Sequence, residues 1–111
     1  MDPCEFFKCL ADETRLKALL LIAKADEACV CDLMEALKLD QPKISRHLAQ
    51  LRKYSILLDE RRGKWVYYKL HPDLPQWVRG VISEAADHNS NYFKSALKRL
   101  NASKSSIRCC N

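Results

Sequence analysis

Apolar residues recur at helical spacing over most of the chain, and they predict two helices at its beginning. Phe6, Phe7 and Leu10 form an apolar stripe within residues 3–11, which indicates a short first helix. Residues 13–25 carry a longer repeat, and Asp12 stands where an N-cap is expected. We therefore expect the second helix to lie at the centre of the core.

Residues 29–54 are predicted to fold as a short helix, a tight turn and a longer basic helix. Asp40 can cap the free amides of the longer helix, and Pro42 is tolerated in its first turn, where an amide hydrogen would have no partner. Both helices have one narrow apolar face, so the shorter one can cross behind the longer one. This arrangement predicts a helix-turn-helix motif. The apolar residues are Leu33, Met34 and Leu37 in the shorter helix and Ile44, Leu48 and Leu51 in the longer one.

The pattern changes between residues 57 and 70, where Arg62-Gly63-Lys64 supplies turn chemistry between apolar and aromatic runs. A β-hairpin is predicted there, in the position of a wing. Asp73 to about Leu100 then displays a broad apolar face and is expected to form one last long helix. Gly80 and Asn89-Ser90-Asn91 weaken it locally, so a kink or break is expected there.

The predicted fold class is therefore mainly α with a β-hairpin wing: a winged helix-turn-helix of order α-α-α-α-β-β-α. At 111 residues the chain suits one domain, which we place at residues 1–101, followed by a flexible polar tail at 102–111 that carries a cysteine pair. The last helix displays more apolar surface than a small domain can cover. We therefore expect a homodimer.

The positive charge is concentrated in the motif and the hairpin. Residues 38–69 carry nine Lys or Arg and three Asp or Glu, a net charge of +6, within a chain whose net charge is +5. A local basic stripe is typical of a protein that binds the phosphates of double-stranded DNA. The expected DNA-binding residues are Gln41, Lys43, Ser45, Arg46, His47, Gln50 and Lys53 on the longer helix and Arg61, Arg62 and Lys64 at the wing tip.

Six cysteines are the other chemical feature of the chain: Cys4, Cys9, Cys29, Cys31, Cys109 and Cys110. No signal peptide is visible in the sequence and no apolar run is long enough to span a bilayer, so we expect a cytoplasmic protein without a membrane partner. In a reducing compartment, cysteines are expected to be thiols, metal ligands or redox sensors rather than structural disulfides.

With these elements the chain resembles the ArsR/SmtB family of dimeric winged-helix metal-sensing repressors over about residues 5–95. The resemblance is carried by Leu10-Ala11-Asp12-Glu13-Thr14-Arg15, by QPKISRHLAQLRK in the longer helix of the motif and by GKWVYYKL in the wing. Cys29-Val30-Cys31-Asp32-Leu33 resembles the inducer site of the arsenic-responsive branch. The resemblance implies a repressor that leaves its operator DNA when trivalent arsenic or antimony binds these thiolates, with no cofactor needed for folding.

The chemistry of Cys29 and Cys31 supports this interpretation. Trivalent arsenic is soft and prefers thiolates, and a cysteine at a helix N-terminus has a lowered pKa. Residues i and i+2 of a regular helix point about 200° apart. Both sulfurs can then reach one ion only if the helix start frays, and we expect binding to deform the motif. The arsenic branch often has a third cysteine where this chain has Met34, so a third ligand would have to be Cys109 or Cys110, or Cys4 or Cys9.

Two other hypotheses use the same cysteines. The same DNA-binding fold would sense oxidants, persulfide or a soft divalent metal such as cadmium or lead. A thiol oxidoreductase is disfavoured, because no Cys-x-x-Cys lies on a βαβ pattern and no general base or cofactor loop is recognisable. We therefore expect no enzyme activity. The family's zinc site on the last helices is also expected to be absent, because Asp87 and His88 are adjacent and no second histidine follows.

Overall fold

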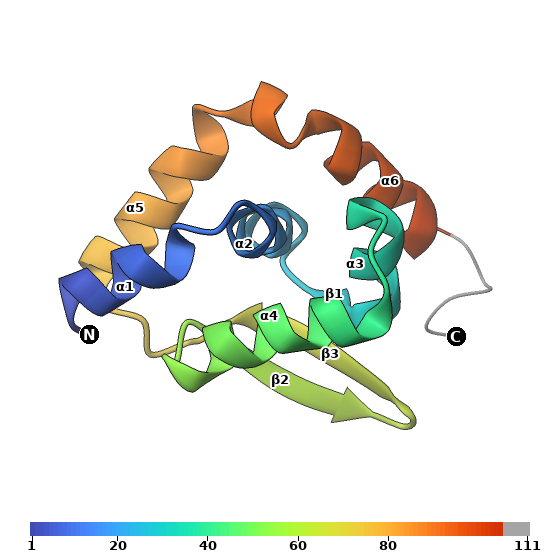
Figure 1. Cartoon of the computed structure of the whole chain (residues 1–111), viewed down its shortest axis with the longest axis horizontal. Helices are drawn as coiled ribbons and strands as arrows, with labels where there is room; N and C mark the ends of the chain where they lie inside the picture. The colour runs from blue at the N-terminus through green and yellow to red at the C-terminus, as the bar shows by residue number, and fades with distance from the viewer. Residues whose placement is uncertain (106–111) are drawn as a thin grey trace.

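The computed structural model describes residues 1–105, which form six α-helices, one 3₁₀ turn and a three-stranded sheet (Figure 1). The helix-turn-helix and the wing lie where the sequence predicts them. The elements in order are α1 Pro3–Leu10, α2 Glu13–Ala25, β1 Ala28–Cys29, α3 Val30–Leu37, α4 Gln41–Lys53, β2 Leu57–Arg62, β3 Trp65–Leu70, α5 Gln76–Asp87, η1 Ser90–Tyr92 and α6 Lys94–Lys104.

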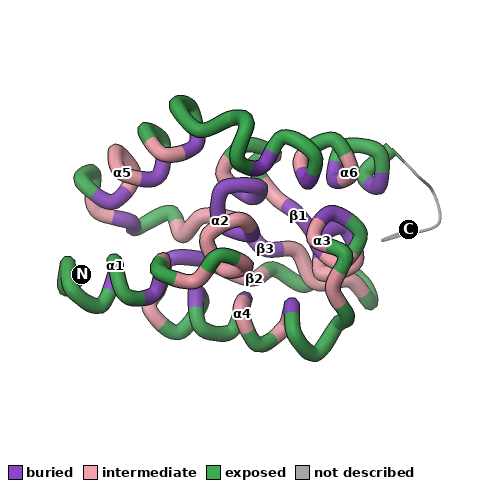
Figure 2. Tube along the Cα trace, turned by 45° about the horizontal axis from the view of Figure 1, so that its top comes forward, coloured by how far each residue is buried: buried purple, intermediate pink, exposed green. Residues whose placement is uncertain are grey.

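Helix α2 occupies the centre of the molecule, seen nearly end-on in Figure 1, with the other helices around it and the sheet below. Five consecutive residues of α2, 18–22, are buried, because neighbours cover this helix on several sides (Figure 2). Its start is fixed by Asp12, whose carboxylate accepts the Arg15 amide at 2.9 Å. Both the central position and the cap were predicted.

The sheet contains a strand that the sequence did not indicate. β1 pairs with β3 in antiparallel register, Ala28 with Tyr68 and Cys29 with Tyr67. The hairpin strands β2 and β3 pair from Leu57–Leu70 to Arg62–Trp65, and Gly63 has a φ of +64° in the turn. The strand order is therefore β1-β3-β2, which joins the segment before α3 to the wing.

The prediction of one long last helix is wrong. Helix α5 ends at Asp87, a 3₁₀ turn follows, and α6 begins at Lys94 and turns back to pack against α3 at the other end of the molecule (Figure 1). The break lies at the Asn89-Ser90-Asn91 segment that was expected to weaken the helix, whereas Gly80 lies inside α5. Helix α6 runs to Lys104, so residues 102–104, expected in the tail, are helical. No helix within residues 1–105 has the length and apolar character needed to cross a bilayer.

Candidate DNA-binding surface and thiol site

Helix α4 presents one face to the core and the other to solvent, as its sequence pattern predicts. Ile44, Leu48 and Leu51 are fully buried. Asp40 caps the helix by accepting the Lys43 amide at 3.2 Å, and Pro42 lies in the first turn. Figure 2 shows the outer edge of α4 as an exposed stripe along the molecule. Of the predicted DNA-binding residues on this helix, Gln41, Lys43, Arg46, Gln50 and Lys53 are exposed, and Ser45 is half-buried.

His47 differs from the other predicted DNA-binding residues, because its side chain turns toward α2. Only 17% of the side chain is exposed, and Nδ1 lies 3.8 Å from a carboxylate oxygen of Asp12, without a hydrogen bond. The Arg15 amide is the main cause of the lowered pKa of Asp12, and His47 contributes to it. The His47 side chain therefore packs between α4 and the start of α2.

The three basic residues of the wing tip have different surroundings. Arg61 and Lys64 are exposed, and Arg61 donates to the Gly63 carbonyl at 3.4 Å. Arg62 instead binds two carboxylates: both of its terminal nitrogens contact Glu27, and Glu60 accepts at 2.6 Å and 3.0 Å. The Arg62 guanidinium is thus held by two carboxylates, and its side chain remains 46% exposed.

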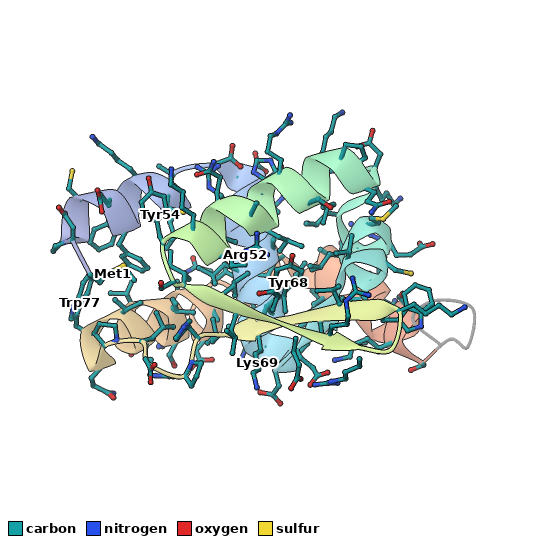
Figure 3. The ribbon with its side chains drawn as sticks, turned by 90° about the horizontal axis from the view of Figure 1, so that it is seen from below. Met1, Arg52, Tyr54, Tyr68, Lys69 and Trp77 are labelled. Atoms are coloured by element: carbon teal, nitrogen blue, oxygen red, sulfur yellow. The ribbon has the colours of Figure 1, made fainter. Side chains whose placement is uncertain are left out.

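The recognition helix is also tied to the wing. Arg52, at the end of α4, forms an ion pair with Asp59 of β2 at 3.2 Å. Figure 3 shows Arg52 close to Tyr68 of β3, whose pKa is raised by burial and partly lowered again by Arg52. Because α4 and β2 are linked directly, a movement of the wing can change the pose of the helix.

Cys29 and Cys31 lie where β1 passes into α3. Cys29 is the N-cap residue, fully buried and extended (φ −89°, ψ 166°), and Cys31 is half-buried in the first turn. The regular helix begins only at Val30, so Cys29 already lies outside it, and the separation of about 200° expected within a regular helix does not apply to this pair. Both cysteines are disulfide-bonded in the structure, so the thiols form on reduction.

Both cysteines line the same hollow, which has a volume of about 230 Å³. The hollow lies between the start of α3, the start of α4 and the wing. It is mostly apolar, because Val30, Met34, Trp65 and Val66 contribute much of its wall. Gln41 of the recognition helix and Lys64 of the wing tip complete the lining. One small site thus contacts both parts of the predicted DNA-binding surface, α4 and the wing.

The start of α3 is anchored to α6 through a buried carboxylate. Asp32 is only 3% exposed; one of its oxygens accepts the Ser103 hydroxyl at 2.9 Å and the other accepts the Cys29 amide at 3.4 Å. Arg99 of α6 donates to the Ala36 carbonyl at 2.9 Å, near the end of α3. Helix α6 therefore holds α3 at both ends.

The other cysteines described in the structure do not reach this hollow. Cys4 and Cys9 are free and lie on α1, and burial raises the pKa of the Cys9 thiol. Cys109 and Cys110, the predicted candidates for a third ligand, lie outside the described residues. Within residues 1–105 there is no group of three or more His, Cys, Asp or Glu that could hold a metal ion. Asp87 pairs with Lys24, and His88 contacts Glu84.

Comparison with known proteins gives the family. The model of the bacterial regulatory protein arsR family matches residues 12–56, from the N-cap of α2 to just beyond α4. Arsenic resistance transcriptional regulator ArsR1 of Pseudomonas putida is 53% identical over 100 residues, which cover 90% of this chain and 78% of that one. This chain belongs to the arsR family.

Two further proteins extend the likeness of this arsR-family chain. Arsenic resistance transcriptional regulator ArsR2 of Pseudomonas putida is 50% identical over 114 residues, 99% of each chain. The crystal structure of the AntR antimony-specific transcriptional repressor covers 77% of this chain and 74% of that one, with a TM-score of 0.63 and 27% identity. The arsR-family chain is thus a winged helix-turn-helix transcriptional regulator, and its relatives are regulators rather than enzymes.

Sequence reasoning missed the side chains that connect the parts of this arsR-family fold. Arg52 was not singled out, the two carboxylates that hold Arg62 were not foreseen, and neither Glu27 nor Asp32 was given a role. The partners of Glu27 and Asp32 lie 35 and 71 residues away along the chain. No local pattern in the sequence marks such pairs.

Proposed function

We propose that the protein is an operator-binding repressor that trivalent arsenic or antimony releases from DNA by binding to the reduced sulfurs of Cys29 and Cys31. The observation that carries this proposal is the shared hollow, which both cysteines line together with Gln41 of α4 and Lys64 of the wing. A thiophilic ion in that hollow would lie against the elements that face DNA.

The donor set fits a soft trivalent ion. Each arsenic–sulfur bond forms when a cysteine sulfur displaces hydroxide from arsenic, and the thiol proton leaves with that hydroxide as water. Thiolates are the preferred ligands of soft ions, and the thioether of Met34 is a weak donor in the same wall. We assign the third position, where the ion needs one, to Cys109 or Cys110.

Release requires that the ion fit one conformation better than another. The walls of the hollow belong to α3, α4 and β3, and the wing strand β3 is paired with the strand that ends in Cys29. An ion held by both sulfurs would change the spacing of these elements. The bound form would then present α4 and the wing tip in positions that fit a duplex poorly.

We further propose that the protein binds a palindromic operator as a homodimer through α1 and α5. Phe7 and Trp77 are 51% and 40% exposed, and Trp77 stacks edge-on against Phe6 with ring centroids 5.4 Å apart. Figure 3 shows Met1 and Trp77 near one another at this edge. A symmetric pairing there would present two copies of α4, about 34 to 36 Å apart for adjacent major grooves.

The test is release of the reduced protein from labelled operator DNA, followed by fluorescence anisotropy. Arsenite, antimonite, cadmium, zinc and peroxide are added in parallel to the wild type, to the Cys29→Ser/Cys31→Ser variant and to a Cys4→Ser/Cys9→Ser control. We expect arsenite and antimonite to release the wild type and the control but not the Cys29/Cys31 variant. A complex that survives saturating arsenite, or a variant released as readily as the wild type, contradicts the proposal.

A second candidate signal is an oxidant. Cys29 and Cys31 are disulfide-bonded in the structure, which favours a site that can also be oxidised. The samples with peroxide test this candidate. If peroxide without arsenite releases the protein from DNA, and a dithiol restores binding, the site is assigned to redox sensing. Release by arsenite alone assigns it to the metalloid.

A further inference from the structure

A chain of contacts runs across the sheet from Cys29 to the wing tip. Cys29 is paired with Tyr67 on β3, and Tyr67 is paired on its other side with Glu60 on β2. Directly paired residues of antiparallel strands project to the same face. The Arg62 guanidinium lies over the Tyr67 ring, 4.4 Å from its centroid. Arg62 therefore crosses β3 and reaches the segment that leads into Cys29.

At the end of this chain of contacts, the Glu27 carboxylate accepts hydrogen bonds from Arg62. Its two carboxylate oxygens bind the two terminal nitrogens of Arg62, one of them at 2.9 Å, in a bidentate pair. Lys104 of α6 donates to the Glu27 carbonyl at 2.8 Å, so its backbone is held as well. Arg62 is the main cause of the lowered pKa of Glu27, and Lys104 and Lys69 add to it. Glu27 is thus fixed two residues before Cys29.

We infer that the Glu27–Arg62 pair, supported by Tyr67, positions the wing relative to the cysteine segment, so that ligand capture at Cys29 also moves the wing. This inference rests on the proposed function and deepens it: Arg62 is a positioning residue rather than a phosphate contact. The wing would leave its DNA-bound position because the Glu27–Arg62 pair moves with β1. Without this pair, the wing would respond to the ligand through the short β1–β3 pairing alone.

Arg61 provides a matched control within the chain. It is a neighbouring arginine of the same strand, but its side chain donates to the Gly63 carbonyl of its own turn and is exposed. Arg61→Gln and Arg62→Gln therefore remove the same charge at nearly the same place. A residue that contacts phosphate lowers the salt dependence of DNA binding when it is neutralised, by about one counterion of slope. Neutralising a positioning residue instead changes how strongly arsenite binding weakens DNA binding.

The experiment measures two quantities for the wild type, Glu27→Gln, Arg61→Gln, Arg62→Gln and the Glu27→Gln/Arg62→Gln double variant. One is the salt slope of operator affinity. The other is the coupling factor, which is the ratio of arsenite affinities of free and DNA-bound protein. Arsenite binding to the free protein is followed by Trp fluorescence. Circular dichroism checks that each variant is folded.

We expect Glu27→Gln and Arg62→Gln each to lower the coupling factor about three- to fivefold, the scale of one well-formed ion pair. The double variant should lower it no further, and arsenite affinity of the free protein should be unchanged. Arg61→Gln should lower the salt slope and leave the coupling factor unchanged.

The inference is overturned if Arg62→Gln lowers the salt slope as Arg61→Gln does while Glu27→Gln leaves the coupling factor at its wild-type value. Arg62 is then a phosphate contact. It is also overturned if the two single variants lower the coupling factor additively in the double variant. If arsenite fails to release the wild type, the proposed function fails. Release of wild type and variants with one common coupling factor contradicts only the role of the pair.

Discussion

Replacing Asp32 by alanine should destabilise the fold more than most single changes in the described part of the chain. Asp32 is a carboxylate only 3% exposed to solvent, placed between the start of α3 and the last turn of α6. The substitution removes the acceptor of the Ser103 hydroxyl, which is itself only 6% exposed, and of the Cys29 amide. The Ser103 hydroxyl then loses its carboxylate partner in a place where water has little access.

The magnitude follows from the two contacts. A hydrogen bond to a charged group contributes about 1.5–3 kcal/mol, and a buried polar group left without its partner costs about 1–3 kcal/mol. The bond to Ser103 is short at 2.9 Å, whereas the amide contact at 3.4 Å is long. Removing the carboxylate also removes the cost of its desolvation. We expect the free energy of unfolding to fall by about 2–3 kcal/mol.

Urea unfolding followed by circular dichroism, in reductant and at one fixed protein concentration, measures this change. The concentration is fixed because association of two copies would add to the apparent stability. Ser103→Ala is the matched control, because it removes the short bond and leaves the carboxylate. Its cost should be about 1–2 kcal/mol, and the double variant should cost less than the sum of the single ones. An Asp32→Ala protein within about 0.5 kcal/mol of the wild type would refute this reasoning.

Leu48→Ala should lower the free energy of unfolding by about 2–5 kcal/mol in the same assay, because Leu48 is fully buried between α4 and the core. Arg46→Ala should weaken operator binding by about 1–3 kcal/mol in fluorescence anisotropy without changing the urea midpoint, and unchanged affinity would move the reading surface elsewhere. Neutralising Arg61 and Lys64 together should reduce the salt slope of operator binding by about two counterions. An unchanged slope would mean that the wing tip does not contact the phosphates. Because the pKa of Asp12 is lowered in the folded state, its contribution to stability is present above about pH 4 and is lost as the pH falls through the folded-state pKa. Asp12→Asn can still cap α2 but does not titrate, so it should lose less stability than the wild type between about pH 6 and pH 3. An equal loss would contradict this.

Residue spacing alone was enough to predict the parts of this protein that form within a few residues of one another. Three such features are local: the apolar face of α4, the caps at Asp12 and Asp40, and the Arg62-Gly63-Lys64 turn. Each appears where it was predicted. Apolar periodicity reports which face of a helix is buried, whatever it is buried against. The exposed basic face of α4 followed from the same pattern.

Only the tertiary structure decided how these parts are connected. β1 exists because Ala28 and Cys29 meet β3, nearly 40 residues further along the chain. The weak Asn89-Ser90-Asn91 segment marked where the last helix breaks, but the direction that α6 takes afterwards depends on its packing against α3. Arg62 looked like its neighbour Arg61 in the sequence, yet one binds two carboxylates and the other faces solvent.

The same division holds for the thiol site. The sequence identified the two cysteines and their position at a helix start, because both are local facts. It could not show that Cys29 is extended and buried, or that Gln41, Lys64 and Trp65 line the same hollow as both sulfurs. Those relations depend on which distant surfaces come into contact when the chain collapses. Local spacing encodes the elements, whereas side-chain packing between elements encodes the path from the cysteines to DNA.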